Sequence, residues 1–512
     1  MSAVTIDWAK ALDLSRAATN LRFEMGSNDW HWDPWDWPEL DFVVKKEPSL
    51  AVQHCSGSGS LQPALIDVPK ENWGARPAVV LDLMDRLIYQ ALVDRLSVRL
   101  IGGLDPNVYG WRLPALNPKA GTYSQNKRQW EGYRRHLQEL VWRYDVALRT
   151  DLVSFFASLP VAPVQEAIQD KTPKGEVTSR LCDLIEGFDD VSGRSGLPQR
   201  SFASAAIANM YLTPLDDVLA SHATAIPVLF KSKTTRMSFT RWMDDILWFG
   251  ADAAAARQIQ MELQSVARSL GLNLNDAKTE VLEGSQLDVI LDIEHSAVDD
   301  AIDNRKDFKP LEGLIDRLLD QRELAGRSSI KFAARRMRDH SHHYRADDIA
   351  TTAERMPHVA DSWAELMKEV FTQSSLQDWF LEYAASDWAT YEWSIARFGH
   401  MFPTAKRPRR ALRDFCSTAI RDSNTSIPLL ALAAQRLTAW DPPEGRAACR
   451  DGIKRASTPH ARRILALAAL GAGETRTTVR KWLRQDKENY PTLRMLESEG
   501  YAARKVAKIF AG

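Results

Sequence analysis

The sequence has few cysteines and no long apolar run. Its four cysteines, Cys55, Cys182, Cys416 and Cys449, include no C-x-x-C pair, which argues against a disulfide framework or a zinc site. The longest apolar runs are far shorter than the roughly 20 residues that a membrane-spanning helix needs. The first residues show no basic segment followed by an apolar stretch, so we expect no secretory signal, a cytoplasmic location and no membrane partner.

The chain also lacks an excess of either charge, with 66 Lys and Arg against 67 Asp and Glu. The balance hides an asymmetry, because residues 404–512 hold 22 Lys and Arg against 10 Asp and Glu, and residues 1–403 hold 44 against 57. A basic region on an acidic body suggests that a polyanion binds at one end. Charge alone slightly favours the alternative, a solvated helical surface.

At 512 residues the chain is long enough for two or three domains. We expect residues 1–72 to form an N-terminal extension that packs on the following domain. It contains an acidic, tryptophan-rich patch at residues 28–38 and a Gly/Ser tract at residues 56–60. The prolines and the lack of a period in the patch predict an irregular segment that packs on something else.

The middle of the chain mixes predicted strands and helices, which indicates an α+β domain. Apolar spacing predicts helices at 81–100, 130–144, 201–220 and 258–270. Residues 146–150 predict a buried strand that ends at Asp151, and residues 238–250 predict two short strands around a Met-Asp-Asp turn.

Beyond about residue 300 nearly every stretch predicts an Ala- and Leu-rich helix. The sequence Leu430–Ala434 recurs as Leu465–Ala469, 35 residues later. This period lies in the range of stacked helical repeats, although a non-repetitive helical bundle accounts for two copies almost equally well.

Three aspartates carry the chemistry that this sequence suggests. Asp151 ends an apolar strand, and Asp244 and Asp245 sit at the tip of an apolar hairpin. Neighbouring carboxylates repel each other and are costly to desolvate unless a cation neutralises them. Two Mg²⁺ ions about 4 Å apart can clamp both oxygens of an in-line phosphoryl displacement, and Mn²⁺ is an alternative metal. A lone Asp-Asp pair would more often be a turn or cap.

The blocks around these aspartates resemble, in order, the conserved blocks of reverse transcriptases over about residues 76–282. The resemblance is closest to group II intron and retron-like enzymes, and it implies a right-hand-like fingers and palm domain. The matching segments are Arg86–Leu92, Tyr109–Arg112, Asp151–Ser158, Gly196–Gln199 followed by Ser204, Asn209 and Asp216, Trp242–Asp245, and Leu272–Thr279.

The resemblance also implies roles for individual residues. Arg112 would lie against the incoming triphosphate, and Lys278 would act on the leaving pyrophosphate. Leu152, Phe156 and Gln199 would bind dNTP. Phe156 and Gln199 would shape its sugar site, where Phe156 excludes a ribose 2′-hydroxyl. Asp151, Asp244 and Asp245 would be the catalytic and metal-binding residues.

The sequence departs from the family pattern at three places. Trp242 stands where the family has Tyr, and Arg200 stands where a Gly usually follows L-P-Q. No primer-grip block or thumb is recognisable after Lys278. A palm joined to helices in place of a thumb resembles the abortive-infection and other defence-associated bacterial reverse transcriptases. The implied domains are residues 1–72, fingers and palm at 73–295, and a HEAT-like helical repeat at 300–512.

The sequence therefore predicts a Mg²⁺-dependent DNA polymerase that acts in antiphage defence. The narrower resemblance implies synthesis from dNTPs without a template and from a protein primer, so that single-stranded DNA is covalently attached to the protein. It also implies a homo-oligomer, a trimer or hexamer. One alternative is a conventional reverse transcriptase that copies a partner noncoding RNA. Another is a degenerate palm that serves as a scaffold.

Overall fold

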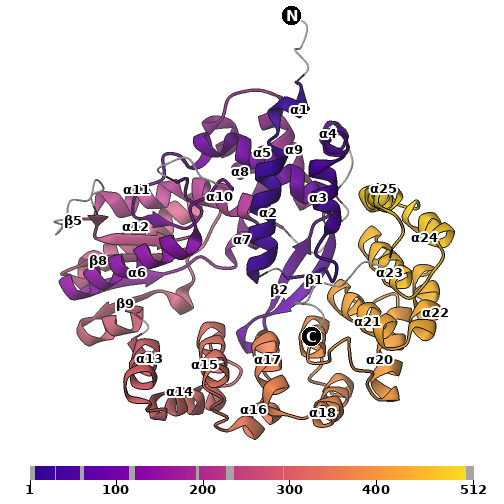
Figure 1. The fold of residues 1–512 in the computed structure, drawn as a ribbon. Helices are drawn as coiled ribbons and strands as arrows, with labels where there is room; N and C mark the ends of the chain where they lie inside the picture. Colours follow the sequence, from indigo (N-terminus) through magenta and orange to yellow (C-terminus); the bar gives the residue numbers. More distant parts are fainter. Residues whose placement is uncertain are drawn as a thin grey trace, which may run out of the picture. The chain divides into compact units, whose positions relative to one another are not determined.

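The computed structural model describes residues 6–28, 30–57, 61, 63–114, 121–191, 195–226, 236–291 and 293–502. The chain folds as two compact units (Figure 1). Unit 1 comprises Met1–Asp29, Pro48–Leu61 and Met84–Glu294, and unit 2 comprises Trp30–Glu47, Gln62–Leu83 and His295–Gly512. No helix within the described ranges has the length and apolar character needed to span a membrane.

A five-stranded sheet forms the centre of unit 1. Its spatial order is β3 (Val108–Tyr109), β7 (Phe239–Trp242), β8 (Asp245–Gly250), β4 (Val146–Thr150) and β9 (Glu280–Glu283). The β7–β8, β8–β4 and β4–β9 pairs are antiparallel, and β3 runs parallel to β7. The predicted strand at 146–150 and the predicted hairpin at 238–250 are therefore confirmed.

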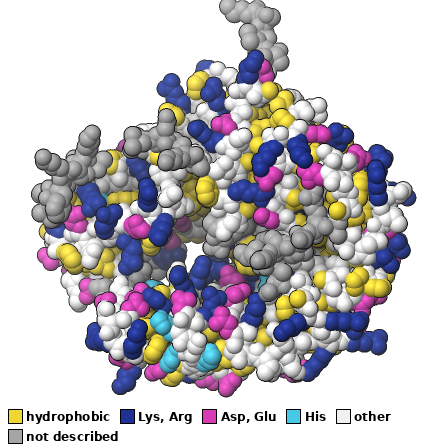
Figure 2. Space-filling view, viewed as in Figure 1, with side chains coloured by type: hydrophobic (Ala, Val, Ile, Leu, Met, Phe, Trp, Pro, Cys, Tyr) yellow, Lys and Arg dark blue, Asp and Glu magenta, His cyan; other side chains and the backbone are white. Residues whose placement is uncertain are grey.

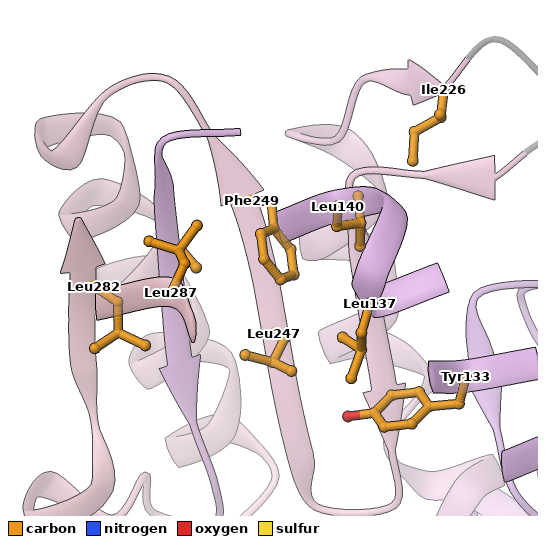
Figure 3. Packing of buried hydrophobic residues seen from close by; sticks show 9 residues of the cluster. Tyr133, Leu137, Leu140, Ile226, Leu247, Phe249, Leu282 and Leu287 are labelled. Atoms are coloured by element: carbon orange, nitrogen blue, oxygen red, sulfur yellow. The ribbon is translucent and has the colours of Figure 1, made fainter. Parts of the chain in front are cut away.

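Apolar side chains from helix α6 (Asn126–Arg143) pack on this sheet (Figure 3). The spacing of Tyr133, Leu137 and Leu140 puts them on one face of the helix. They meet Leu247 and Phe249 of β8, which point to the same face of the sheet because they are two residues apart. Helix α12 (Ala253–Ser269) packs on β4, β8 and β9.

The predicted helix at residues 201–220 is wrong, because two helices occupy this stretch. They are α10 (Phe202–Tyr211) and α11 (Thr213–Ser221). Pro214 lies in the first turn of α11 and has no amide hydrogen to continue the hydrogen bonds of α10. The predicted helices at 81–100 and 130–144 are present as α5 (Leu83–Ile101) and α6. The predicted helix at 258–270 begins earlier, because Asp252 caps α12.

Unit 1 contains further helices and short strands. They are α1 (Trp8–Ala11), α2 (Leu14–Asn28), α4 (Pro48–Ser56), α7 (Phe155–Ser158), α8 (Val161–Lys171), α9 (Glu176–Asp189), β5 (Ala225–Ile226), β6 (Arg236–Met237), η2 (Asp276–Lys278) and η3 (Gly284–Leu291). A further helix, α13 (Ile293–Arg305), begins at the end of unit 1 and continues into unit 2.

Unit 2 is built mainly from helices that stack on their second neighbour. Helices α15, α17, α19, α21 and α23 contact one another in succession, and α18, α20 and α22 do the same. The recurring sequences at 430–434 and 465–469 lie in α21 and α23, which pack together. The bounds are α14 (Lys309–Asp320), α15 (Arg327–Asp339), α16 (Ala346–Ala353), η4 (Pro357–Val359), α17 (Ala360–Val370), α18 (Gln373–Ala385), α19 (Glu392–Gly399), α20 (Arg410–Arg421), α21 (Ile427–Trp440), α22 (Pro442–Ile453), α23 (Pro459–Gly471), α24 (Arg476–Leu483), η5 (Lys487–Asn489) and α25 (Tyr490–Glu499).

Many arginines of unit 2 form ion pairs between neighbouring helices. Examples are Arg338 with Glu365, Arg409 with Asp378, and Arg413 with Asp441. On the face shown in Figure 2, acidic and basic side chains are interspersed over helices α13–α18. After residue 404, Arg421 pairs with Glu444, Arg450 with Glu474 and Arg462 with Asp486, so part of the basic charge of this region is paired within the fold.

The tryptophan-rich segment, residues 30–47, packs on the C-terminal helices. Trp393 Nε1 and Arg397 Nη2 both donate to the carbonyl oxygen of Trp30, at 3.0 and 2.9 Å. The Arg397 guanidinium also lies 3.6 Å from the ring centre of Trp32. This segment ends in α3 (Pro38–Lys45), which contacts α25. The expected extension at residues 1–72 is thus divided between the two units.

A hairpin of unit 2 precedes the first long helix of unit 1. Its strands are β1 (Ala64–Pro69) and β2 (Ala75–Val80), and they are joined by η1 (Glu71–Trp73). Strand β1 contacts α19 and α21. Residues that precede the polymerase-like blocks are therefore built into the helical unit.

A buried ion cluster fastens the tryptophan-rich segment to α23. Arg463 Nε and Nη2 each donate to a carboxylate oxygen of Glu39 at 2.9 Å, and Nη1 donates to Asp33. All three side chains are at most 4% exposed. Because two carboxylates share one guanidinium away from water, removing that cation leaves both carboxylates without a counter-charge.

We predict that Arg463→Ala lowers the free energy of unfolding by about 3–5 kcal/mol, the cost of breaking a buried ion pair. Urea unfolding followed by tryptophan fluorescence measures this loss. The control is Arg410→Ala, whose ion pair with Asp414 is exposed and should leave the unfolding curve unchanged. Equal stability of the two variants would contradict the prediction.

Candidate active site

Strand register brings the three aspartates together at one end of the sheet. In the antiparallel β4–β8 pair, Thr150 is opposite Ile246. Asp151 follows Thr150, and Asp245 precedes Ile246. Continuing the antiparallel register by one residue therefore puts Asp151 opposite Asp245. Asp244 lies in the turn immediately before β8. The structure therefore places the three aspartates that the sequence singled out at one site.

A two-residue turn presents Asp244. Trp242 pairs with Asp245, so Met243 and Asp244 alone connect β7 to β8. Met243 has a φ of 57°, in the left-handed region that a residue with a side chain seldom adopts. Such strain persists only where the surrounding structure holds it in place, and it is frequent at functional sites.

Residues 272–279 contact Asp151 and the residue after it. The Asn275 amide donates to the Asp151 carbonyl at 2.9 Å, and Leu152 forms an isolated bridge with Leu274. Lys278 Nζ lies 2.7 Å from Asp151 Oδ2, although 67% of the lysine side chain is exposed. The structure therefore brings Lys278 to the aspartates, as the sequence suggested.

Mutual repulsion shapes the electrostatics of this site. Burial, and then the charges of Asp245 and Asp151, raise the pKa of Asp244 to about 7. Burial and Asp151 also raise the pKa of Asp245. Burial lowers the pKa of Lys278, but its contacts with Asp151 and the other carboxylates outweigh that effect and raise it. One lysine thus offsets only part of the negative charge.

The chemistry of the donors fits a divalent cation. Asp151 Oδ1 is buried and has no hydrogen-bond partner among the described residues. Carboxylate oxygens that repel each other and lack donors are suitable ligands for Mg²⁺, which also takes substrate phosphate oxygens. Within the described ranges no group of three or more His, Cys, Asp or Glu side chains is arranged to hold a metal ion as it stands, so substrate oxygens would have to complete the coordination. Asp151, Asp244 and Asp245 would therefore supply part of a coordination shell.

The segments of Phe156 and Gln199 lie side by side. The Leu197 amide donates to the Phe156 carbonyl at 2.9 Å. Gly196 has a φ of 70°, and a Cβ there would lie 2.1 Å from the same carbonyl oxygen, so only glycine fits. Phe156 and Gln199 are both half-buried, whereas Leu152 is buried. The predicted sugar-site residues thus come from neighbouring segments.

Arg112 makes a different set of contacts from the one that the resemblance implied. Its guanidinium donates to the carbonyl oxygens of Leu104, Asp105 and Val108, and it is half-buried. In this structure Arg112 holds the loop before β3, and its proposed contact with a triphosphate has no support from these bonds.

Sequence reasoning missed the surroundings of Trp242. The Trp242 ring centre lies 5.2 Å from Trp130, 5.5 Å from Tyr133 and 6.5 Å from Trp111. A cavity of about 170 Å³, lined in part by Trp130, Asp245 and Val289 of η3, opens beside this cluster. The Trp-rich composition of the segments at 111, 130 and 242 was a signal that could have indicated this aromatic wall.

Arg241 was missed as well. It is the charged residue of the apolar strand β7, and its side chain is fully buried. Its position three residues before Asp244 was the signal that could have linked it to the site.

Comparison with known proteins agrees with this site. Residues 68–299 match the family described as "Reverse transcriptase (RNA-dependent DNA polymerase)". This part of the chain is a reverse transcriptase domain, a class that uses divalent metal ions. This domain indicates a nucleotidyltransferase of the RNA-directed DNA polymerase class. No curated protein matches the chain.

The raised pKa of Asp244 predicts how pH affects stability without metal. The unfolded chain loses this proton near pH 4, whereas the folded protein keeps it until about pH 7. Folded protein therefore binds more protons between these values, so its free energy of unfolding falls as the pH rises from 4 to 7. We expect Asp244→Asn to reduce this fall, measured by chemical unfolding in EDTA. An unchanged pH slope in the variant would contradict the prediction.

Proposed function

We propose that the protein is a Mg²⁺-dependent DNA polymerase whose metals bind Asp151 and Asp244, with Asp245 beside them. The observation that carries this proposal is the β4–β8 register, which brings Asp151 and Asp245 together at the turn that holds Asp244. Bound metal ions would activate the attacking hydroxyl and offset charge on the leaving oxygen. Mn²⁺ is a suitable replacement because it accepts the same oxygen ligands.

The residues around the aspartates suit substrate binding and proton transfer. The Lys278 side chain is largely exposed, so its Nζ would be able to turn from Asp151 to the leaving pyrophosphate and give it a proton or positive charge. Phe156 and Gln199 would form the sugar site, where Phe156 would exclude a 2′-hydroxyl, and Leu152 would contribute to dNTP binding. The contacts of Arg112 support a role in holding the loop before β3.

We predict that replacing both Asp244 and Asp245 by Ala abolishes dNTP incorporation, because the metals lose most of their protein ligands. Incorporation of labelled dNTP by purified protein measures this, and circular dichroism checks the fold. The control is Asp217→Asn, an exposed carboxylate of α11 in the same domain, which should keep full activity. Full synthesis by the Asp244/Asp245 variant would contradict the proposal.

We further propose that synthesis proceeds without a conventional template and begins on a protein side chain. Two features support this. Arg200 places a long cationic side chain, in a left-handed backbone conformation with a φ of 60°, directly after Gln199. The polymerase-like blocks are also followed by stacked helices, since the chain enters unit 2 at His295.

The resemblance to abortive-infection enzymes extends the proposal to antiphage defence and to a trimer or hexamer. The alternative is a conventional reverse transcriptase that copies a partner noncoding RNA, and the description of the matched family as RNA-dependent favours this alternative. The two functions differ in what they require besides dNTPs.

Supplying each labelled dNTP separately, with and without added RNA, distinguishes the two functions. For the template-independent function we predict incorporation without RNA, and label that remains with the protein after denaturation and is released by protease. For the defence role, the Asp244/Asp245 variant should lose phage protection in a plating assay. Incorporation that requires RNA and leaves the protein unlabelled would contradict protein-primed synthesis and support the alternative.

A further inference from the structure

Arg241 is a charged residue in the interior of the catalytic sheet. It lies in β7, and its side chain is 0% exposed. A guanidinium without water costs several kcal/mol unless its donors and its charge are satisfied. The surroundings of Arg241 must therefore supply acceptors and a counter-charge.

Those acceptors come from two helices and from the catalytic turn. Arg241 Nε and Nη2 donate to the two carboxylate oxygens of Asp216 on α11, at 2.6 and 2.7 Å. Nη1 donates to Asn209 Oδ1 on α10 and to the Met243 carbonyl oxygen, both at 2.9 Å. Asp216 is 3% exposed and Asn209 is 0% exposed. Asp216 thus neutralises the charge of Arg241 through Nε and Nη2, and Nη1 is left to donate to the turn.

The bond to Met243 acts on the peptide group that leads into Asp244. The carbonyl of Met243 belongs to the same planar unit as the Asp244 amide, so fixing one fixes the other. Met243 is the residue in the left-handed conformation, with a φ of 57°. A hydrogen bond from a buried, rigid guanidinium can hold such a strained turn, because the planar fork loses little freedom when it binds.

The same network extends to the loop after β3. Asn209 Nδ2 donates to the Gly110 carbonyl oxygen at 3.0 Å. The path from Gly110 through Asn209 and Arg241 to Met243 is therefore a continuous set of buried hydrogen bonds. It joins three of the reverse-transcriptase-like blocks behind the aspartates.

We propose that Arg241 is a positioning residue for nucleotidyl transfer. It holds the Met243–Asp244 peptide so that Asp244 and Asp245 face Asp151 despite their repulsion. Asp216 balances the buried charge of Arg241 and so stabilises the arginine in this position. This inference rests on the proposed metal-binding role of the three aspartates and goes beyond it, because it assigns the residue that sets their geometry.

Arg241→Lys tests the proposal directly. Lysine keeps a positive charge for Asp216, but its compact ammonium cannot span Asp216, Asn209 and the Met243 carbonyl at once. We expect kcat for dNTP addition to fall about 10- to 100-fold, because small misplacements of catalytic groups cost this much. The KM for dNTP should change by less than about threefold, since no dNTP contact is removed. Mn²⁺ binding, followed by electron paramagnetic resonance, should also weaken.

Asp216→Asn is the matched variant that separates positioning from stability. It removes the counter-charge of a buried arginine and should lower the melting temperature strongly. It leaves the Nη1 bond to Met243 in place, so kcat and Mn²⁺ affinity should fall much less than in Arg241→Lys. Arg236→Lys is the control. Arg236 lies on β6, the strand before β7, and makes a half-exposed ion pair with Glu139 of α6. All three properties should stay at the wild-type level in this control.

Two outcomes would overturn the inference. One is wild-type kcat and Mn²⁺ affinity in Arg241→Lys. The other is a loss of kcat that simply follows the loss of stability in both variants. If Arg241→Lys does not fold, Asn209→Ala replaces it, and unchanged kcat and Mn²⁺ affinity there would overturn the inference as well. An active Asp244/Asp245 variant would instead refute the proposed metal site, so the two failures can be told apart.

Discussion

Repulsion among three carboxylates is the constraint on which the rest of unit 1 depends. Burial raises the pKa of Asp244 and of Asp245, and the negative charges of neighbouring carboxylates raise both further. A flexible chain would separate them. The sheet prevents this, since strand pairing fixes Asp151 opposite Asp245 and the two-residue turn leaves Asp244 little freedom. The folded protein therefore carries the free-energy cost of this repulsion until a cation binds between the carboxylates.

The two cations near the site are arranged differently. Arg241 is buried behind the turn and its charge is matched by Asp216, so it shapes the backbone and leaves the catalytic charge largely unchanged. Lys278 lies in front, mostly exposed, with its ammonium on Asp151. Because most of the Lys278 side chain is exposed, we expect a metal ion to displace its ammonium group from the buried Asp151 without disturbing the fold. A site that binds and releases charged substrates needs both a rigid backbone, which Arg241 would provide, and a cation that can leave its carboxylate, which Lys278 would provide.

The sequence allowed the local part of this site to be predicted. An apolar run of strand length ends in Asp151, and two such runs flank Asp244 and Asp245, which indicates carboxylates at the edge of a buried sheet. The break at Pro214 was missed because the apolar spacing continues through it. The hydrogen bonds of Arg112 could not be predicted, because its acceptors are backbone carbonyl oxygens. Every residue has one, so the sequence does not mark which carbonyls an arginine will contact. The partner of Asp33 was equally hidden, because Arg463 is 430 residues away.

The division of the chain into units also differs from the division that sequence similarity gives. The reverse transcriptase match begins at residue 68, yet residues up to Leu83 belong to the helical unit. Strand β2 lies within the match, and its partner β1 contacts α19 and α21. The helices are therefore not a module appended after the polymerase blocks. Part of the matched domain folds with them, because β2 pairs with β1, and β1 packs on α19 and α21.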